Sequence, residues 1–144
     1  MEQLAKQTQY VFFNKINIYM ATMYKGFSTV GRTKKYRLTD QDLIKQDLIN
    51  HFYIRKGEKL MNPNFGTIIW NVLFEPMTDD LKAVIIADIK QVASYDPRLS
   101  IDNVVVTEFE QGIQVELQLR FVESNQINMM NLKFDGANNT LTTA

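Results

Sequence analysis

The chain has 144 residues, enough for one domain with a single hydrophobic core. Hydrophobic residues make up 45% of it, and its 16 basic and 16 acidic side chains cancel. This balance argues against nucleic acid and membranes as partners, because both attract a broad positive field. The lack of cysteine excludes disulfides, thiolate metal sites and a thiol nucleophile, and no run reaches the roughly 18 apolar residues of a membrane-spanning helix. We therefore expect a protein made in the cytosol.

Residues 1–38 show no sustained helical or strand periodicity, and we treat them as an N-terminal arm. The first regular element begins near Thr39, where the run from Thr39 to Asp42 is typical of a helix capping box. Side chains suited to one buried stripe then recur at helical spacing, which predicts an amphipathic helix: they are Ile44, Leu48, His51 and Phe52.

The segment over residues 57–66 is rich in turn-forming residues and is expected to be a loop. Glycine stands at both of its ends, and a proline flanked by asparagines lies inside it. We expect this loop to have a structural role, with a phenylalanine as its apolar anchor. The residues assigned to the structural loop are Gly57, Glu58, Pro63, Phe65 and Gly66.

Two further helices are predicted after the loop. The apolar run Ile68–Phe74 predicts a short buried helix that ends before Pro76. A longer helix begins at the N-cap Thr78 and must end before Pro97, because a proline disfavours the helical conformation of the residue before it. Its predicted buried stripe consists of Leu81, Val84, Ile85, Ile89 and Val92.

The remaining sequence predicts strands. Apolar and polar side chains alternate over residues 113–121, and Gly112 indicates a tight return from a strand at about 101–109. The register that we favour sets Val105 opposite Leu117 in the core. The same register sets Asp102 opposite Arg120 on the exposed face, which is a favourable cross-strand pair.

A third strand is expected over about 127–134, followed by a polar tail over residues 136–144. Its favoured register buries Met130, Leu132 and Phe134, whereas a register shifted by one would place Asn131 in the core. We therefore predict an α+β fold over residues 39–135. Two main helices plus a short one pack on a three-stranded antiparallel β-meander.

The sequence offers little for catalysis, and we expect no catalytic residues, no cofactor and no metal site. His51 is the only histidine, and its place on the helix indicates a packed or surface side chain. Glu108 and Glu116 are the remaining candidates, because glycoside hydrolases use two carboxylates about 5–10 Å apart. The predicted register puts both on one exposed face, where nothing would raise the pKa of either acid.

The last predicted strand has an outer edge defended by a single lysine and no proline. Such an edge favours the addition of a strand from another protein, although the N-terminal arm could cover it instead. The residues assigned to this edge are Asn128, Met129, Met130, Asn131, Leu132, Lys133 and Phe134.

The run Arg55-Lys-Gly-Glu-Lys-Leu-Met-Asn-Pro-Asn-Phe-Gly66 resembles the signature of small baseplate wedge proteins of contractile-tailed phages, which have relatives in type VI secretion baseplates. The order of helices, loop and strands agrees with that family over roughly residues 24–135. The family's Glu-Pro-Arg turn is matched by Asp96, Pro97 and Arg98, with an acid shorter by one methylene. Residues 1–22 lie outside the resemblance, and Met20 or Met23 could be the true start.

The resemblance implies a structural protein of the virion tail baseplate, assembled in the host cytoplasm, and not an enzyme. In that family the acid–proline–arginine turn, here Asp96, Pro97 and Arg98, binds the helical core bundle of the wedge. The sheet accepts strands from the tail sheath protein and so initiates the sheath. The resemblance further implies six copies or a multiple of six, and contacts with tail tube or hub proteins.

Three other interpretations remain open at this point. A lysozyme-like glycoside hydrolase is the first, since that activity is sometimes attached to the family by label. A free-standing regulator or immunity-type binding module is the second. The third concerns Asp96, Pro97 and Arg98 alone, which could form only a helix C-cap and turn.

Overall fold

The computed structural model describes residues 24–29 and 37–143, and the chain divides into two compact units, Met1–Leu43 and Ile44–Ala144. In the first unit, strands β1 (Lys25–Phe27) and β2 (Arg37–Thr39) pair antiparallel. Asp40 joins this pair, because its backbone N–H donates to the Tyr24 carbonyl at 3.0 Å and its carboxylate accepts from the Tyr24 N–H at 3.1 Å. Most of the predicted N-terminal arm lies outside the described residues.

The three predicted helices are present: α2 (Asp40–Tyr53), α3 (Ile69–Val72) and α4 (Asp79–Ser94). The stripe predicted for α2 is confirmed, since Ile44, Leu48, His51 and Phe52 are its buried residues. The N-cap of α4 is also confirmed, because the Thr78 hydroxyl accepts from the Leu81 N–H at 3.2 Å. Within the described ranges, no helix has the length and apolar character that crossing a bilayer requires.

Two of the five positions predicted for the buried stripe of α4 are not buried. Leu81 is of intermediate exposure and Val84 is exposed, whereas Ile85, Ile89 and Val92 are buried as expected. Asp88 is buried although it is charged, so the inner face of α4 carries a carboxylate as well as apolar side chains.

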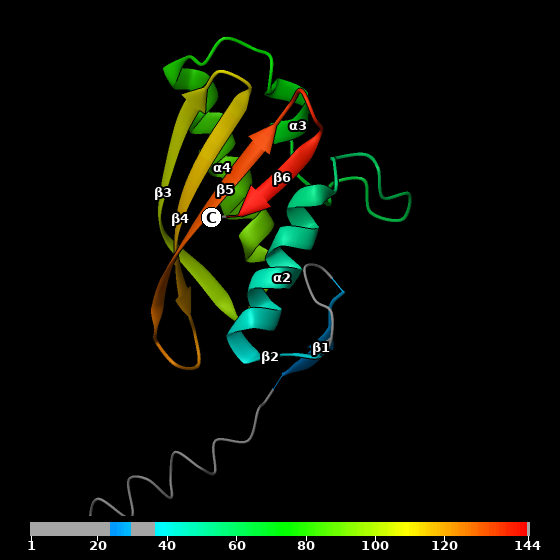
Figure 1. Ribbon diagram of the computed structural model, residues 1–144, viewed down its shortest axis with the longest axis vertical. Coiled ribbons are helices and arrows are strands. Elements are labelled where there is room, and N and C mark those ends of the chain that lie inside the picture. Colours follow the sequence, from blue (N-terminus) through cyan, green and yellow to red (C-terminus); the bar gives the residue numbers. More distant parts are fainter. Residues whose placement is uncertain (1–23, 30–36, 144) are drawn as a thin grey trace, which may run out of the picture. The chain divides into compact units, whose positions relative to one another are not determined.

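The sheet of the second unit has four strands in the order β3-β4-β5-β6, so the prediction of a three-stranded meander is wrong (Figure 1). Strands β3 (Leu99–Phe109), β4 (Gly112–Phe121) and β5 (Ile127–Asp135) correspond to the predicted ones. The fourth, β6 (Thr140–Thr143), forms from residues expected to belong to the polar tail. Helix α4 lies behind the sheet in Figure 1 and packs against β3.

The predicted register of the first hairpin is wrong by one residue. Val104, and not Val105, lies opposite Leu117, and a bulge between Ile101 and Asn103 shifts the pairing further. Because side chains alternate between faces, this slip exposes Val105. Ser100, and not Asp102, lies opposite Arg120, but the Asp102 carboxylate still forms an ion pair with the Arg120 guanidinium at 2.7 Å.

The predicted register of the second hairpin is wrong by two residues, which leaves the faces unchanged. Met130 lies opposite Leu117, and Phe134 lies opposite Ile113. All three side chains predicted to be buried on β5 are buried, because a shift of two preserves the alternation. The four-residue loop expected before β5 is correspondingly longer, and Asn125 adopts a positive φ of 52° within it.

The only tryptophan joins two helices to the sheet. The Trp70 indole N–H of α3 donates to the Phe52 carbonyl of α2 at 2.7 Å. The Trp70 ring meets Phe134 of β5 edge to face, with 5.3 Å between ring centroids. Burying these large rings supplies much of the stabilisation of the core.

Strand β6 is held by a short backbone ladder with β5 and by hydrogen bonds from two side chains. It pairs only with Leu132–Asp135 of β5, and Leu141 is its one buried residue. The Tyr53 hydroxyl donates to the Leu141 carbonyl at 2.7 Å, and Arg55 donates to the Asn139 side chain at 2.7 Å. The end of α2 therefore fixes the C-terminal strand in place.

Leu141→Ala should lower the free energy of unfolding by about 2 kcal/mol, because it removes the one apolar anchor of β6. Urea denaturation monitored by circular dichroism measures this loss. The control Thr142→Ala, at an exposed position of the same strand, should change stability by less than about 0.5 kcal/mol. Equal and small effects of both substitutions would contradict an integral fourth strand.

Candidate functional site

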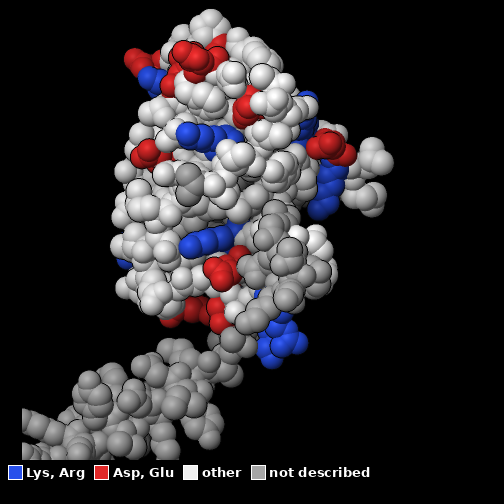
Figure 2. All heavy atoms as spheres, viewed as in Figure 1, with Lys and Arg blue, Asp and Glu red and all other residues white. Residues whose placement is uncertain are grey.

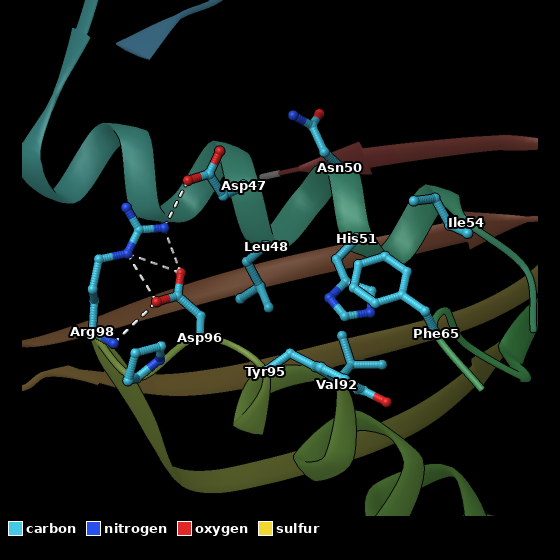
Figure 3. Close-up of a pocket in the computed structure, with 11 residues that line it drawn as sticks. Asp47, Leu48, Asn50, His51, Ile54, Phe65, Val92, Tyr95, Asp96 and Arg98 are labelled. Atoms are coloured by element: carbon cyan, nitrogen blue, oxygen red, sulfur yellow. Dashed lines mark hydrogen bonds and ion pairs between the residues drawn. The ribbon is translucent and has the colours of Figure 1, made fainter. Parts of the chain in front are cut away.

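The turn that connects α4 to β3 borders a surface pocket of about 420 Å³. Asp96, Pro97 and Arg98 form this turn, which we call the corner, and α2 supplies the opposite wall of the pocket (Figure 3). The floor and sides are largely apolar: Leu48, Ile54, Phe65, Val92 and Tyr95. The pocket therefore combines an apolar interior with a charged rim.

Arg98 is the centre of the charged rim. Its guanidinium donates to both carboxylate oxygens of Asp96, at 2.6–3.1 Å, and to Asp47 of α2 at 2.7 Å. The Arg98 backbone N–H also donates to Asp96 at 3.0 Å, and the Arg98 carbonyl accepts from the Val122 N–H at 3.0 Å. The corner is therefore tied both to α2 and to the turn between β4 and β5.

These contacts keep the corner charged. Partial burial works to raise the pKa of Asp96, but the hydrogen bonds and positive charge of Arg98 outweigh it, so the pKa lies below its ordinary value. The hydrogen bonds that the guanidinium donates to Asp96 raise the pKa of Arg98. Because one guanidinium is paired with two carboxylates, the group of Asp47, Asp96 and Arg98 carries one net negative charge.

An aromatic cluster forms the other side of the pocket. The rings of His51 and Phe65 stack with centroids 3.6 Å apart, and Tyr95 packs against both. The His51 Nε2 accepts from the Gly66 N–H at 3.3 Å, which requires that this nitrogen is unprotonated. Burial, followed by the charge of Lys59, lowers the pKa of His51 against the opposing effect of Asp88. Of the two placements expected for His51, packed or on the surface, the structure contains the packed one.

The predicted structural loop closes on itself through its backbone. Gly57, at φ +88°, donates to the Pro63 carbonyl at 2.8 Å, and Glu58 accepts from the Arg55 N–H at 2.9 Å. Gly66 adopts a φ of +111°, and a Cβ there would lie 2.6 Å from the Ile54 carbonyl oxygen. This loop position therefore requires glycine.

A buried acid on α4, which is absent from the predicted site residues, holds the loop. Asp88 accepts from the Lys56 ammonium at 2.7 Å, from the Thr67 hydroxyl at 2.7 Å and from the Ile68 N–H at 3.0 Å. The signal was present in the sequence, because Asp88 stands within the apolar stripe of α4. A charged residue in such a stripe predicts a buried partner.

The structure separates the predicted edge residues into two groups. Leu132, Lys133 and Phe134 are paired with β6, so their outer edge is occupied by the chain itself. The ladder with β6 does not extend to the other assigned residues, Asn128, Met129, Met130 and Asn131. The edge predicted for a partner strand is thus covered over its C-terminal half.

The candidate catalytic acids do not share a face, so that prediction is wrong. Glu108 lies opposite the buried Ile113, whereas Glu116 lies opposite the exposed Val105. Directly opposed residues project to the same side of a sheet, so the two carboxylates lie on opposite sides. Among the described residues, no group of histidine, aspartate or glutamate side chains is arranged to hold a metal ion.

The two loop glycines provide a matched test of loop geometry. Gly57→Ala should destabilise the domain by about 1–2 kcal/mol, because it strains a positive φ in open space. Gly66→Ala should cost at least about 3 kcal/mol, because the added Cβ also meets backbone atoms. Denaturant titration measures both free energies. A Gly66 variant as stable as the Gly57 variant would contradict the close backbone approach.

No curated protein matches the chain. Five chains of solved structures match, among them a crystal structure from Geobacter sulfurreducens described as a candidate tail lysozyme. That chain is 18% identical with a TM-score of 0.53, and the match covers 63% of this chain and 89% of the other. At this identity the likeness shows a shared fold.

The sequence profile of the family described as baseplate wedge protein gp25 matches residues 38–128. This range covers more than half of the chain. It includes the loop, all three helices, the corner and two strands of the main sheet. The chain therefore belongs to the baseplate wedge protein gp25 family, whose place is the baseplate of a phage tail.

Proposed function

We propose that this chain is a structural wedge component that binds the wedge core and initiates the tail sheath by strand addition. Family membership supports the baseplate part of this proposal. The observation that carries the binding of the wedge core is the pocket at the corner, where an apolar interior meets a preformed charged rim. We further propose that the protein is assembled in the host cytoplasm and has no enzymatic role.

The corner suits a helical partner. Apolar side chains of an amphipathic helix can enter the pocket between Leu48 and Val92, as in other helix-in-groove contacts. The carboxylate of Asp47 lies at the rim with a side chain 44% exposed, where it can meet a basic group of the partner. Asp96 and Arg98 hold each other, so their main contribution is to fix the rim before binding.

The edge of β5 supports the sheath part of the proposal. A sheath strand that pairs along Asn128–Phe134 would form backbone hydrogen bonds, which survive a rotation of the attached subunit better than side-chain contacts do. Because β6 covers Leu132–Phe134, such a strand has to displace β6. The ladder of β6 is only four residues long, which favours this exchange.

Multiple copies strengthen such contacts. Six copies, or a multiple of six, around a baseplate bind one sheath ring together, and linked contacts give an avidity above that of each contact. Tail tube or hub proteins are further candidate neighbours in the same ring.

The hydrolase alternative gains no support from the two acids, which lie on opposite faces of the sheet. Two carboxylates that flank one glycosidic bond must face a common cleft. Release of cell-wall fragments by the purified protein, lost in Glu108→Gln or Glu116→Gln, would overturn the structural proposal.

Arg98→Ala should leave the domain folded but abolish its incorporation into baseplates, because the rim of the pocket loses its fixed geometry. The stability loss should stay near 1 kcal/mol, since the ion pairs are partly exposed. Co-purification with wedge proteins measures incorporation. The control Asp79→Ala removes a fully exposed ion-pair partner on α4 and should assemble normally. Normal assembly of Arg98→Ala would contradict the assignment of the corner.

An engineered cysteine pair between β5 and β6 should block sheath assembly when it is oxidised to a disulfide. Lys133 and Thr142 lie directly opposite each other and are exposed, and the chain has no native cysteine. The Cα separation of opposed strand residues falls within the range of disulfides. The Lys133→Cys/Thr142→Cys protein should enter baseplates, fail to support sheath polymerisation, and recover after reduction.

Thr142→Cys alone is the control for this experiment, and it should behave like the wild type under both conditions. If the oxidised double variant supports normal sheath assembly, β6 does not have to move. The sheath contact would then lie elsewhere.

A further inference from the structure

Two large apolar side chains stand at the outermost point of the structural loop. Leu60 and Met61, which we call the loop tip, are each 94% exposed. The loop projects away from the sheet between α2 and α3 in Figure 1, and in Figure 2 it ends in uncharged atoms beyond a charged base. No other large hydrophobic side chain among the described residues reaches this exposure.

The conformation of the loop tip is fixed by its neighbours. The Asn62 N–H donates to the Lys59 carbonyl at 3.1 Å, which makes Leu60 and Met61 the central residues of a hydrogen-bonded turn. Such positions usually carry glycine, proline, asparagine, aspartate or serine. Large apolar residues add nothing to the turn itself, so their presence there points to contacts outside the chain.

The base of the loop makes the tip rigid. The stack of Phe65 on His51 and the contacts of Thr67 with Asp88 anchor one side of it, and the bond from Gly57 to Pro63 closes the other. An exposed apolar group on a rigid support binds with little loss of conformational entropy. This arrangement favours a contact with a partner protein.

We propose that the loop tip inserts into an apolar pocket with an acidic rim on the wedge protein that also occupies the corner pocket. Phe65 belongs to both features, because it anchors the loop on His51 and lines the corner pocket, so one residue connects the loop to the pocket. Within segment 55–61, Lys56 is paired with the buried Asp88, and Arg55 and Lys59 against Glu58 leave one net positive charge, which complements an acidic rim. Lys59 lies at the first position of the turn, with its ammonium 4.2 Å from the centre of the Phe65 ring.

This inference rests on the proposed function, because it takes the partner to be a wedge protein. Burial of one such apolar side chain in a partner corresponds to roughly a 10- to 100-fold gain in affinity. Loss of both side chains should therefore weaken wedge binding by at least about 100-fold.

The double variant Leu60→Ser/Met61→Ser tests the proposal. It should keep the wild-type unfolding midpoint, because neither side chain is buried within the chain, and its affinity for the isolated wedge should fall at least 100-fold. The matched control Leu60→Met/Met61→Leu keeps the apolar area and should bind within a few-fold of wild type. Wild-type affinity of the serine variant would overturn the inference.

A single cysteine at the tip gives a direct readout in the assembled particle. Met61→Cys creates the only thiol of the chain, which should react rapidly with a maleimide in the free protein and at least 10-fold more slowly in purified tails. Equal reaction rates in the free protein and in purified tails would overturn the inference. A disulfide between the Met61→Cys positions of two copies of this chain would overturn it as well. If the wild-type chain is absent from purified tails, the proposed function itself fails, whereas an accessible tip in assembled tails refutes the tip contact alone.

Discussion

Asp88 carries a carboxylate into the interior of the domain, where an unpaired charge would be strongly destabilising. The ammonium of Lys56, the hydroxyl of Thr67 and the N–H of Ile68 satisfy it, and these three groups lie at the two ends of the loop. Asp88 therefore holds the two ends of the loop together. Closure of the loop seats Phe65 on His51, and that stack forms one side of the corner pocket. The shape of the pocket thus depends on a charge that lies outside it.

The corner is built by a different kind of contact. The guanidinium of Arg98 lies between Asp47 on α2 and Asp96 after α4, so it joins two carboxylates whose residues are 49 positions apart in the chain. The bond from Val122 to the Arg98 carbonyl adds the sheet to this junction. An arginine suits this position because its planar group can satisfy two carboxylates at once. A partner then meets a rim whose charges are already oriented.

Local patterns in the sequence predicted the helices well and the strands less well, for physical reasons. Helical stripes such as Ile44, Leu48 and Phe52 depend on spacing within one element, which the sequence contains. Strand register depends on two elements and on bulges, so a slip of one residue exposed Val105 and separated the candidate acids Glu108 and Glu116. Strand β6 was missed because three of its four side chains are threonines, which read as a polar tail unless Leu141 is recognised as an anchor.

The sequence predicted where the loop and the corner lie in the chain. It could not predict which residues of other elements they contact. Nothing in the spacing of Asp88 relates it to Lys56, and nothing in the spacing of Asp47 relates it to Arg98, because these contacts exist only after folding. The same holds for the contact of Gly66 with His51. Turns and loops that depend on local backbone conformation can be predicted from the sequence. Side-chain contacts between residues of different elements cannot.

The single indole of the chain lies between Phe52, Phe134 and Tyr53, and Tyr53 donates the hydrogen bond that holds β6. The guanidinium of Arg55, which binds Asn139 just before β6, lies 5.7 Å from the centre of the same ring. Release of β6 would free the Tyr53 hydroxyl and the Arg55 guanidinium, both close to Trp70, from Leu141 and Asn139, and would admit water near the indole. The intrinsic fluorescence of the protein, in wavelength and in quenching by soluble quenchers, is therefore a label-free optical reporter of motion at the rim of the sheet.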